Sequence, residues 1–99
     1  QTDEMILVNE FCMHHQIEIS FVQSLQLSGL IEITQTEETL CVRRDQLPEL
    51  EKMVRLYYEM DINLEGIETI SYLLNRMNQM QEQITHLNNR LQAYEANEE

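Results

Sequence analysis

The first part of the chain alternates short apolar runs with polar breaks. The run at residues 5–8 contains strand-forming side chains and predicts a strand, and Asn9 then offers a cap for a first helix over residues 10–16. Residues 20–28 have apolar positions at helical spacing, and Gly29 supplies a left-handed stop. These apolar positions are Phe21, Val22, Leu25 and Leu27. The two segments together predict a helix-turn-helix.

The next segment has the pattern of a β-hairpin. Residues 30–34 and 39–43 are rich in strand-forming side chains, and the link between them, residues 35–38, is polar. We therefore expect a wing whose tip carries Glu37 and Glu38.

A third helix is expected from Asp45, which can cap it, to about Asp61. Pro48 falls in its first turn, where a missing backbone N–H does no harm. Of the adjacent Tyr57 and Tyr58, one should face the core and the other should border the surface. The expected apolar face consists of Leu47, Leu50, Met53, Val54 and Tyr57.

A fourth, much longer helix should follow Asn63, a good cap, and continue to about Tyr94. From Ile70 onward its apolar residues alternate in steps of three and four, which is the heptad pattern of a coiled coil. Such a stripe needs a partner, so we expect a homodimer, with parallel and antiparallel pairing both open. The alternative is a stripe that folds back on the head as ordinary core. The expected dimer interface consists of Ile70, Leu73, Met77, Met80, Ile84, Leu87, Leu91 and Tyr94.

The order of elements predicts a mainly α protein in two parts. Residues 1–62 would form a winged helix-turn-helix head with a small β-hairpin. Residues 63–99 would form a long C-terminal dimerisation helix, paired as a coiled coil, with a frayed acidic tail. A chain of 99 residues fits one compact domain with such an appended element.

Charge narrows the range of partners. The chain has 18 acidic and 6 basic residues, a formal net charge of -12, which repels phosphate groups and favours cationic protein surfaces. DNA binding is not expected, because affinity for duplex DNA comes largely from cations that displace counterions. Arg43 and Arg44, the first cations in the chain, should pair with acidic residues of the same dimer. The preceding 42 residues contain the acidic residues Asp3, Glu4, Glu10, Glu18, Glu32, Glu37 and Glu38.

The sequence offers little catalytic or metal-binding chemistry. Cys12 and His15 are three residues apart on an expected helix, but two ligands leave a metal site incomplete. We expect no metal, no cofactor and no enzymatic activity, and we interpret Cys12 and Cys41 as reduced core residues. No apolar run is long enough to span a bilayer and no secretion signal is recognisable, so a cytoplasmic protein without membrane contact is expected.

Three local motifs resemble the MerR group of helix-turn-helix proteins. Ser-Gly-Leu-Ile at residues 28–31 is similar to the stop after the MerR recognition helix, and Arg-Asp-Gln-Leu at 44–47 to the entry into the third helix. Residues 62–70 resemble the start of the MerR dimerisation helix. Within this group, the short chain, residues 9–17 and the polar second helix most resemble the chaperone modulator family CbpM.

The resemblance implies a non-catalytic regulator that binds the J-domain of a DnaJ-like co-chaperone, CbpA, and inhibits its action on DnaK. An acidic surface is what a lysine-rich J-domain helix would require. The alternative is a MerR-type transcriptional regulator that binds DNA as a dimer. However, DNA-binding members have a run resembling Arg-Tyr-Tyr-Glu where residues 23–26 are Gln-Ser-Leu-Gln. The candidate partner-binding residues are Glu10, Glu18, Glu32, Glu37 and Glu38.

Overall fold

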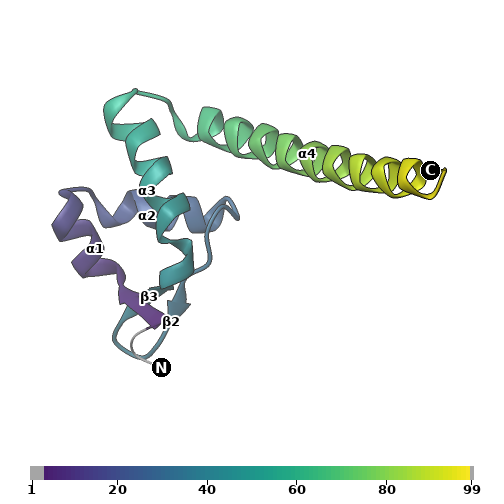
Figure 1. The fold of residues 1–99 in the computed structure, drawn as a ribbon. Helices are drawn as coiled ribbons and strands as arrows, with labels where there is room; N and C mark the ends of the chain where they lie inside the picture. The colour runs from purple at the N-terminus through teal and green to yellow at the C-terminus, as the bar shows by residue number, and fades with distance from the viewer. Residues whose placement is uncertain (1–3, 99) are drawn as a thin grey trace. The chain divides into compact units, whose positions relative to one another are not determined.

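The structure is a computed structural model that describes residues 4–98. Asp3 therefore lies outside the described residues. Contacts divide the chain into two compact units, with the division after Glu68. The first unit contains, in chain order, β1 (Met5–Leu7), α1 (Val8–His15), α2 (Ile19–Leu27), β2 (Thr34–Gln35), β3 (Leu40–Arg43), the 3-10 turn η2 (Arg44–Gln46), α3 (Leu47–Val54) and the π-turn η3 (Arg55–Glu59) (Figure 1). The last helix, α4 (Leu64–Glu98), begins in the first unit and forms the second.

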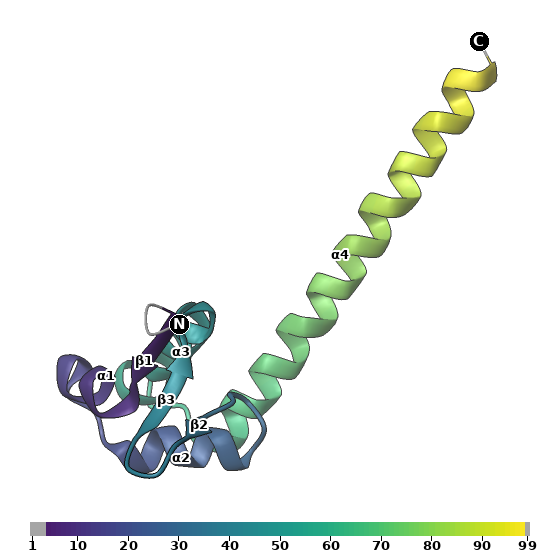
Figure 2. The ribbon, with the colours of Figure 1, turned by 90° about the horizontal axis from the view of Figure 1, so that it is seen from below.

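The expected fold class is confirmed as a mainly helical protein with a small antiparallel sheet and a long C-terminal helix. The sheet has the order β1-β3-β2, which Figure 2 shows from below. Ile6 of β1 pairs with Val42 of β3, and Thr34 of β2 pairs with Cys41. The hairpin was expected over residues 30–34 and 39–43, but its first strand is much shorter than this and covers Thr34–Gln35 alone.

Two of the expected helix caps are wrong. α1 starts at Val8, so Asn9 lies inside its first turn, and Leu7 occupies the cap position without a side-chain hydrogen bond. Asp45 lies within the 3-10 turn η2, where its carboxylate accepts a hydrogen bond from Arg43. The expected cap at Asn63 is confirmed, because its Oδ1 accepts a hydrogen bond from the backbone N–H of Gly66 at 2.9 Å.

The end of α2 follows the expected chemistry. Gly29 has φ +80°, the left-handed conformation that favours glycine, and the amides of Gly29 and Leu30 each donate a 2.9 Å bond to the last turn. Leu27, however, is 86% exposed and takes no part in the buried face expected for this helix.

The third helical segment ends close to the expected position. Pro48 lies in the first turn of α3, as expected, and helical structure continues through η3 to Glu59. Asp61 then has φ 57°, which ends the helix. The final turn is a π-turn, in which the N–H of Met60 donates to the carbonyl of Arg55 at 3.1 Å.

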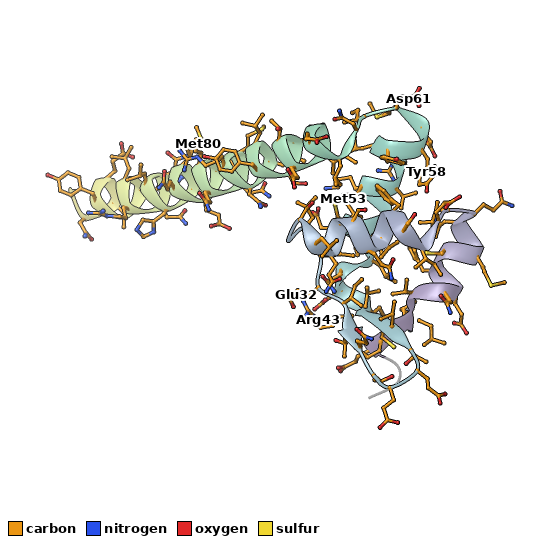
Figure 3. The ribbon with its side chains drawn as sticks, turned by 180° about the vertical axis from the view of Figure 1, so that it is seen from behind. Glu32, Arg43, Met53, Tyr58, Asp61 and Met80 are labelled. Atoms are coloured by element: carbon orange, nitrogen blue, oxygen red, sulfur yellow. The ribbon has the colours of Figure 1, made fainter. Side chains whose placement is uncertain are left out.

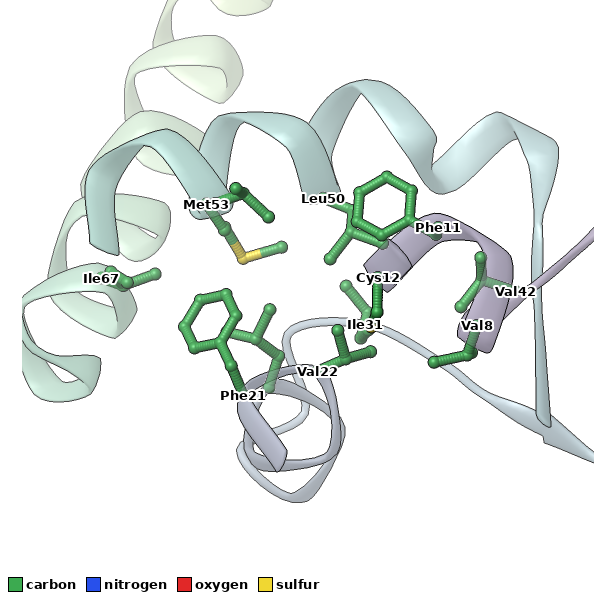
Figure 4. Close-up of a cluster of buried hydrophobic side chains, with 12 residues drawn as sticks. Val8, Phe11, Cys12, Phe21, Val22, Ile31, Val42, Leu50, Met53 and Ile67 are labelled. Carbon is green, nitrogen blue, oxygen red and sulfur yellow. The ribbon is translucent and has the colours of Figure 1, made fainter. Parts of the chain in front are cut away.

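The core of the first unit lies between α1, α2, α3, β3 and the first turns of α4 (Figure 4). In the close-up, Leu50 and Met53 of α3 face Phe21 and Val22 of α2, and Ile67 lies at the edge of the cluster. The packing of these apolar side chains holds together the helices and strands that carry the surface residues of the head. The buried cluster consists of Val8, Phe11, Cys12, Phe21, Val22, Leu25, Ile31, Val42, Leu50, Met53, Val54 and Ile67.

Candidate functional site

The candidate acidic residues all lie on the surface of the head but come from different elements. Glu10 is on α1, Glu18 directly precedes α2, and Glu32 lies between α2 and β2. Glu37 and Glu38 lie in the loop between β2 and β3, at the wing tip. All five are exposed. They come from four separate segments of the head, and their role in partner binding stays a prediction.

Glu32 is already paired within the chain. Arg43 Nη1 lies 3.0 Å from Glu32 Oε1, and Arg43 Nε lies 3.1 Å from Asp45 Oδ1. Figure 3 shows Glu32 and Arg43 side by side at the sheet. The hydrogen bonds to Glu32 and then Asp45 raise the pKa of the Arg43 guanidinium. The cation closest to the wing is thus held by two carboxylates of its own chain.

The outer face of α2 carries no positive charge. Gln23 and Leu27 are exposed, while Leu25 is completely buried. Leu25 and Ser24 stand at the positions of the two tyrosines of the Arg-Tyr-Tyr-Glu run, and Gln23 stands at the position of its arginine. This helix face is accordingly polar and apolar rather than cationic.

An aromatic cluster that the apolar pattern of the chain does not predict lies where η3 meets α2. The ring centroid of Phe21 is 4.4 Å from that of Tyr57 and 5.5 Å from that of Tyr58, and the two tyrosine rings are 5.0 Å apart. Tyr57 is 39% and Tyr58 is 38% exposed, so the expected division into one core and one surface tyrosine is wrong. The only sequence signal was the adjacent pair of tyrosines.

The aromatic cluster borders a surface hollow of about 470 Å³. Among the described residues, Glu18 is the one charged residue that lines it, and its backbone N–H donates a 3.1 Å hydrogen bond to the hydroxyl of Tyr58. This hydrogen bond joins the start of α2 to the π-turn η3. The lining consists of Glu18, Ser20, Phe21, Ser24, Tyr57, Tyr58, Asn63 and Leu64, which we call the aromatic hollow.

A second hollow of about 680 Å³ lies beside the sheet and is mainly apolar. It brings Glu10 and Cys41 together with residues of β1 and the wing. Cys41 is half-buried, whereas Cys12 is buried in the core and its burial raises the pKa of the thiol. The core interpretation therefore holds for Cys12 and only partly for Cys41.

The heptad positions of α4 lie on the surface of the single chain. Ile70 is half-buried, and the other seven are exposed. Their exposed fractions run from 50% for Met80 to 64% for Tyr94. An apolar stripe of this length in water is what a dimerisation helix requires of its partner-facing side.

Metal ligands do not gather in the described part of the chain, where no group of three or more His, Cys, Asp or Glu residues could hold an ion. Cys12 is buried, and His15 Nε2 lies 3.8 Å from Glu51 Oε2. Among residues 4–98, no helix is both long and apolar enough to cross a membrane.

Comparison with known proteins gives one result. The family model described as MerR HTH family regulatory protein matches residues 6–89, which include nearly all of the head and most of α4. No curated protein and no solved structure matched the sequence. The chain belongs to the MerR helix-turn-helix family of regulatory proteins.

Proposed function

We propose that this protein is a chaperone modulator of the CbpM type, which binds the J-domain of a DnaJ-like co-chaperone and inhibits its action on DnaK. The observation that carries the proposal is the charge of the head: residues 1–42 contain no lysine or arginine. Exposed carboxylates such as Glu10, Glu37 and Glu38 suit a lysine-rich surface, for which they would supply steering and orientation.

The family match equally favours a second candidate, a transcriptional regulator that binds DNA as a dimer. Three features of the head argue against it. The outer face of α2 has Gln23 in place of arginine, the wing tip carries two exposed glutamates, and Arg43 is paired with Glu32 and Asp45. Neutralising DNA phosphates needs cations, so these surfaces would bind a duplex poorly at physiological salt.

Homodimerisation through α4 is part of the proposal. The stripe from Ile70 to Tyr94 would be covered by the same stripe of a second copy. Each protomer would then contribute one acidic head, so that the dimer binds two J-domains.

The experiment that tests the function is a calorimetric titration of the protein with a J-domain from the same organism, run beside a mixed-sequence DNA duplex at physiological salt. Saturable binding of the J-domain with one site per protomer, and none of the duplex, is the expected result. Tight, salt-sensitive binding of the duplex would instead favour the transcriptional regulator and would overturn the proposal.

A further inference from the structure

The π-turn at the end of the third helix carries two consecutive tyrosines whose rings both contact the same side chain. In an α-helix, neighbouring residues point about 100° apart, because there are about 3.6 residues per turn. In η3 the turn closes from Met60 to Arg55, one residue wider, and both Tyr57 and Tyr58 contact Phe21. Turns of this kind are rare in proteins, and many of those that occur lie at functional sites.

The rings of Tyr57 and Tyr58 are fixed by their neighbours but remain partly exposed to solvent. Phe21 is 6% exposed and forms a fixed floor, whereas more than a third of each tyrosine faces solvent. The bond from the Glu18 amide to the Tyr58 hydroxyl fixes one of the two rings. Half-exposed aromatic side chains that are already ordered are typical anchors of protein interfaces, because little entropy is lost when they bind.

The charge of the residues that line the aromatic hollow favours a cationic ligand. Its lining includes the acidic residue Glu18 and the hydroxyl-bearing residues Ser20 and Ser24, and no cation lines it among the residues that the structure describes. Arg55 and His15 line a separate hollow that shares Tyr58 and also contains Glu51 and Glu59. Aromatic ring faces beside a carboxylate attract a cation twice, through the ring quadrupole and through the ion pair.

We propose that the aromatic hollow binds one basic side chain, arginine or lysine, presented by a helix of the partner protein. Its cationic group lies against Tyr57 and Tyr58 and donates hydrogen bonds to the Glu18 carboxylate. The inference rests on the proposed function, in which that partner is a J-domain, and it adds the point at which the basic J-domain surface is anchored.

The first test measures J-domain affinity of four variants by calorimetry. Tyr57→Leu keeps apolar bulk but removes the ring, and it should weaken binding about five- to tenfold. Glu18→Gln keeps the backbone bond to Tyr58 and should weaken binding about threefold or more. Tyr57→Phe keeps a ring face and should stay within about twofold of the native protein. Glu82→Gln, an equal charge change on the second unit, should have no effect.

The second test does not depend on the J-domain. The protein has four tyrosines, so ring resonances can be followed individually by NMR during titration with a hexa-arginine peptide. Tyr57 and Tyr58 should shift together, while Tyr72 and Tyr94 of α4 should not, and Glu18→Gln should reduce the shifts. A hexaglutamate peptide should leave all four unchanged.

The outcomes separate the two proposals. If the native protein binds the J-domain and Tyr57→Leu and Glu18→Gln bind equally well, the aromatic hollow is not the anchor and the proposed function stands. If the J-domain does not bind, the proposed function fails, and ring shifts with hexa-arginine would still support the hollow as a site for basic side chains. Absence of those shifts overturns the inference.

Discussion

The side-chain amide of Gln46 pairs with the backbone of Glu32 as a neighbouring strand would. Gln46 Oε1 accepts a hydrogen bond from the Glu32 N–H at 2.8 Å, and Gln46 Nε2 donates to the Glu32 carbonyl at 2.8 Å. Both backbone groups of Glu32 are thus satisfied without a partner strand. This amide connects the segment that follows α2 to η2, the turn that directly precedes α3 in the chain.

Replacing this side chain should lower the stability of the head. Gln46→Ala removes two hydrogen bonds and should reduce the free energy of unfolding by about 1–2 kcal/mol, measured by chemical denaturation. Gln26→Ala, at an exposed position of α2, is the matched control and should change stability by less than about 0.5 kcal/mol. Equal stability of the two variants would show that the amide contributes nothing.

The same contact explains why the wing was predicted only in part. The strand formers at residues 30–34 were visible in the sequence, and Ile31 is buried as such a residue should be. Whether they join a ladder depends on what lies beside them, and here Gln46 occupies that place at Glu32. The pairing of β1 with β3 was equally out of reach, because it joins segments far apart in the chain.

Local chemistry was predictable where one residue decides it. Gly29 and Asn63 were identified correctly, because a left-handed stop and a side-chain cap depend mainly on one residue. The caps expected at Asn9 and Asp45 were wrong, because α1 already begins at Val8 and Asp45 lies within the 3-10 turn η2.

The aromatic cluster was missed, because apolar spacing does not predict the π-turn that contains Tyr57 and Tyr58. It forms where the helix packs on Phe21.

The α4 cap should contribute measurably to stability. Asn63→Ala removes the acceptor for the Gly66 N–H and should cost about 1 kcal/mol in thermal or denaturant unfolding. Asn63→Asp should stay within about 0.5 kcal/mol of the native value, because a carboxylate accepts the same bond and suits a helix N-terminus. If Asn63→Asp lowered the free energy of unfolding and Asn63→Ala did not, the prediction that this side chain caps α4 would be contradicted.

The heptad stripe should hold together the homodimer that we propose. Ile84→Asp combined with Leu87→Asp would place charges in the paired stripe and should give monomers by sedimentation equilibrium. Thr85→Asp combined with Asn89→Asp adds the same charge away from the stripe and should leave the dimer intact. A dimeric stripe variant would mean that assembly uses another surface.

The wing tip should contribute to J-domain binding through its charge. Glu37→Lys with Glu38→Lys should weaken binding about three- to tenfold and flatten its dependence on salt concentration. Calorimetry over a range of salt concentrations measures both effects. The pair Glu82→Lys and Glu95→Lys changes the net charge equally on α4, and its affinity should stay closer to the native value. Unchanged affinity of the wing variant would remove the wing from the site.

The two thiols should differ in reactivity. Cys12 is 3% exposed and must wait for local opening, so a thiol reagent should modify it more than about a hundredfold more slowly than Cys41. Cys12→Ser and Cys41→Ser assign the slow and fast phases. Because burial raises the pKa of the Cys12 thiol, stability should fall as pH rises from the ordinary thiol value towards the folded one. Two equally fast thiols would contradict this prediction.

The π-turn makes the number of residues between Val54 and Asp61 important for the aromatic cluster. Between Val54 and Asp61, the bond from Met60 to Arg55 accommodates one residue more than an α-helical turn would. A relative with one residue fewer here would keep a helix yet separate the two tyrosine rings. In an alignment of this family, a single gap at this point would therefore distinguish homologues that keep the paired rings from homologues that have lost them.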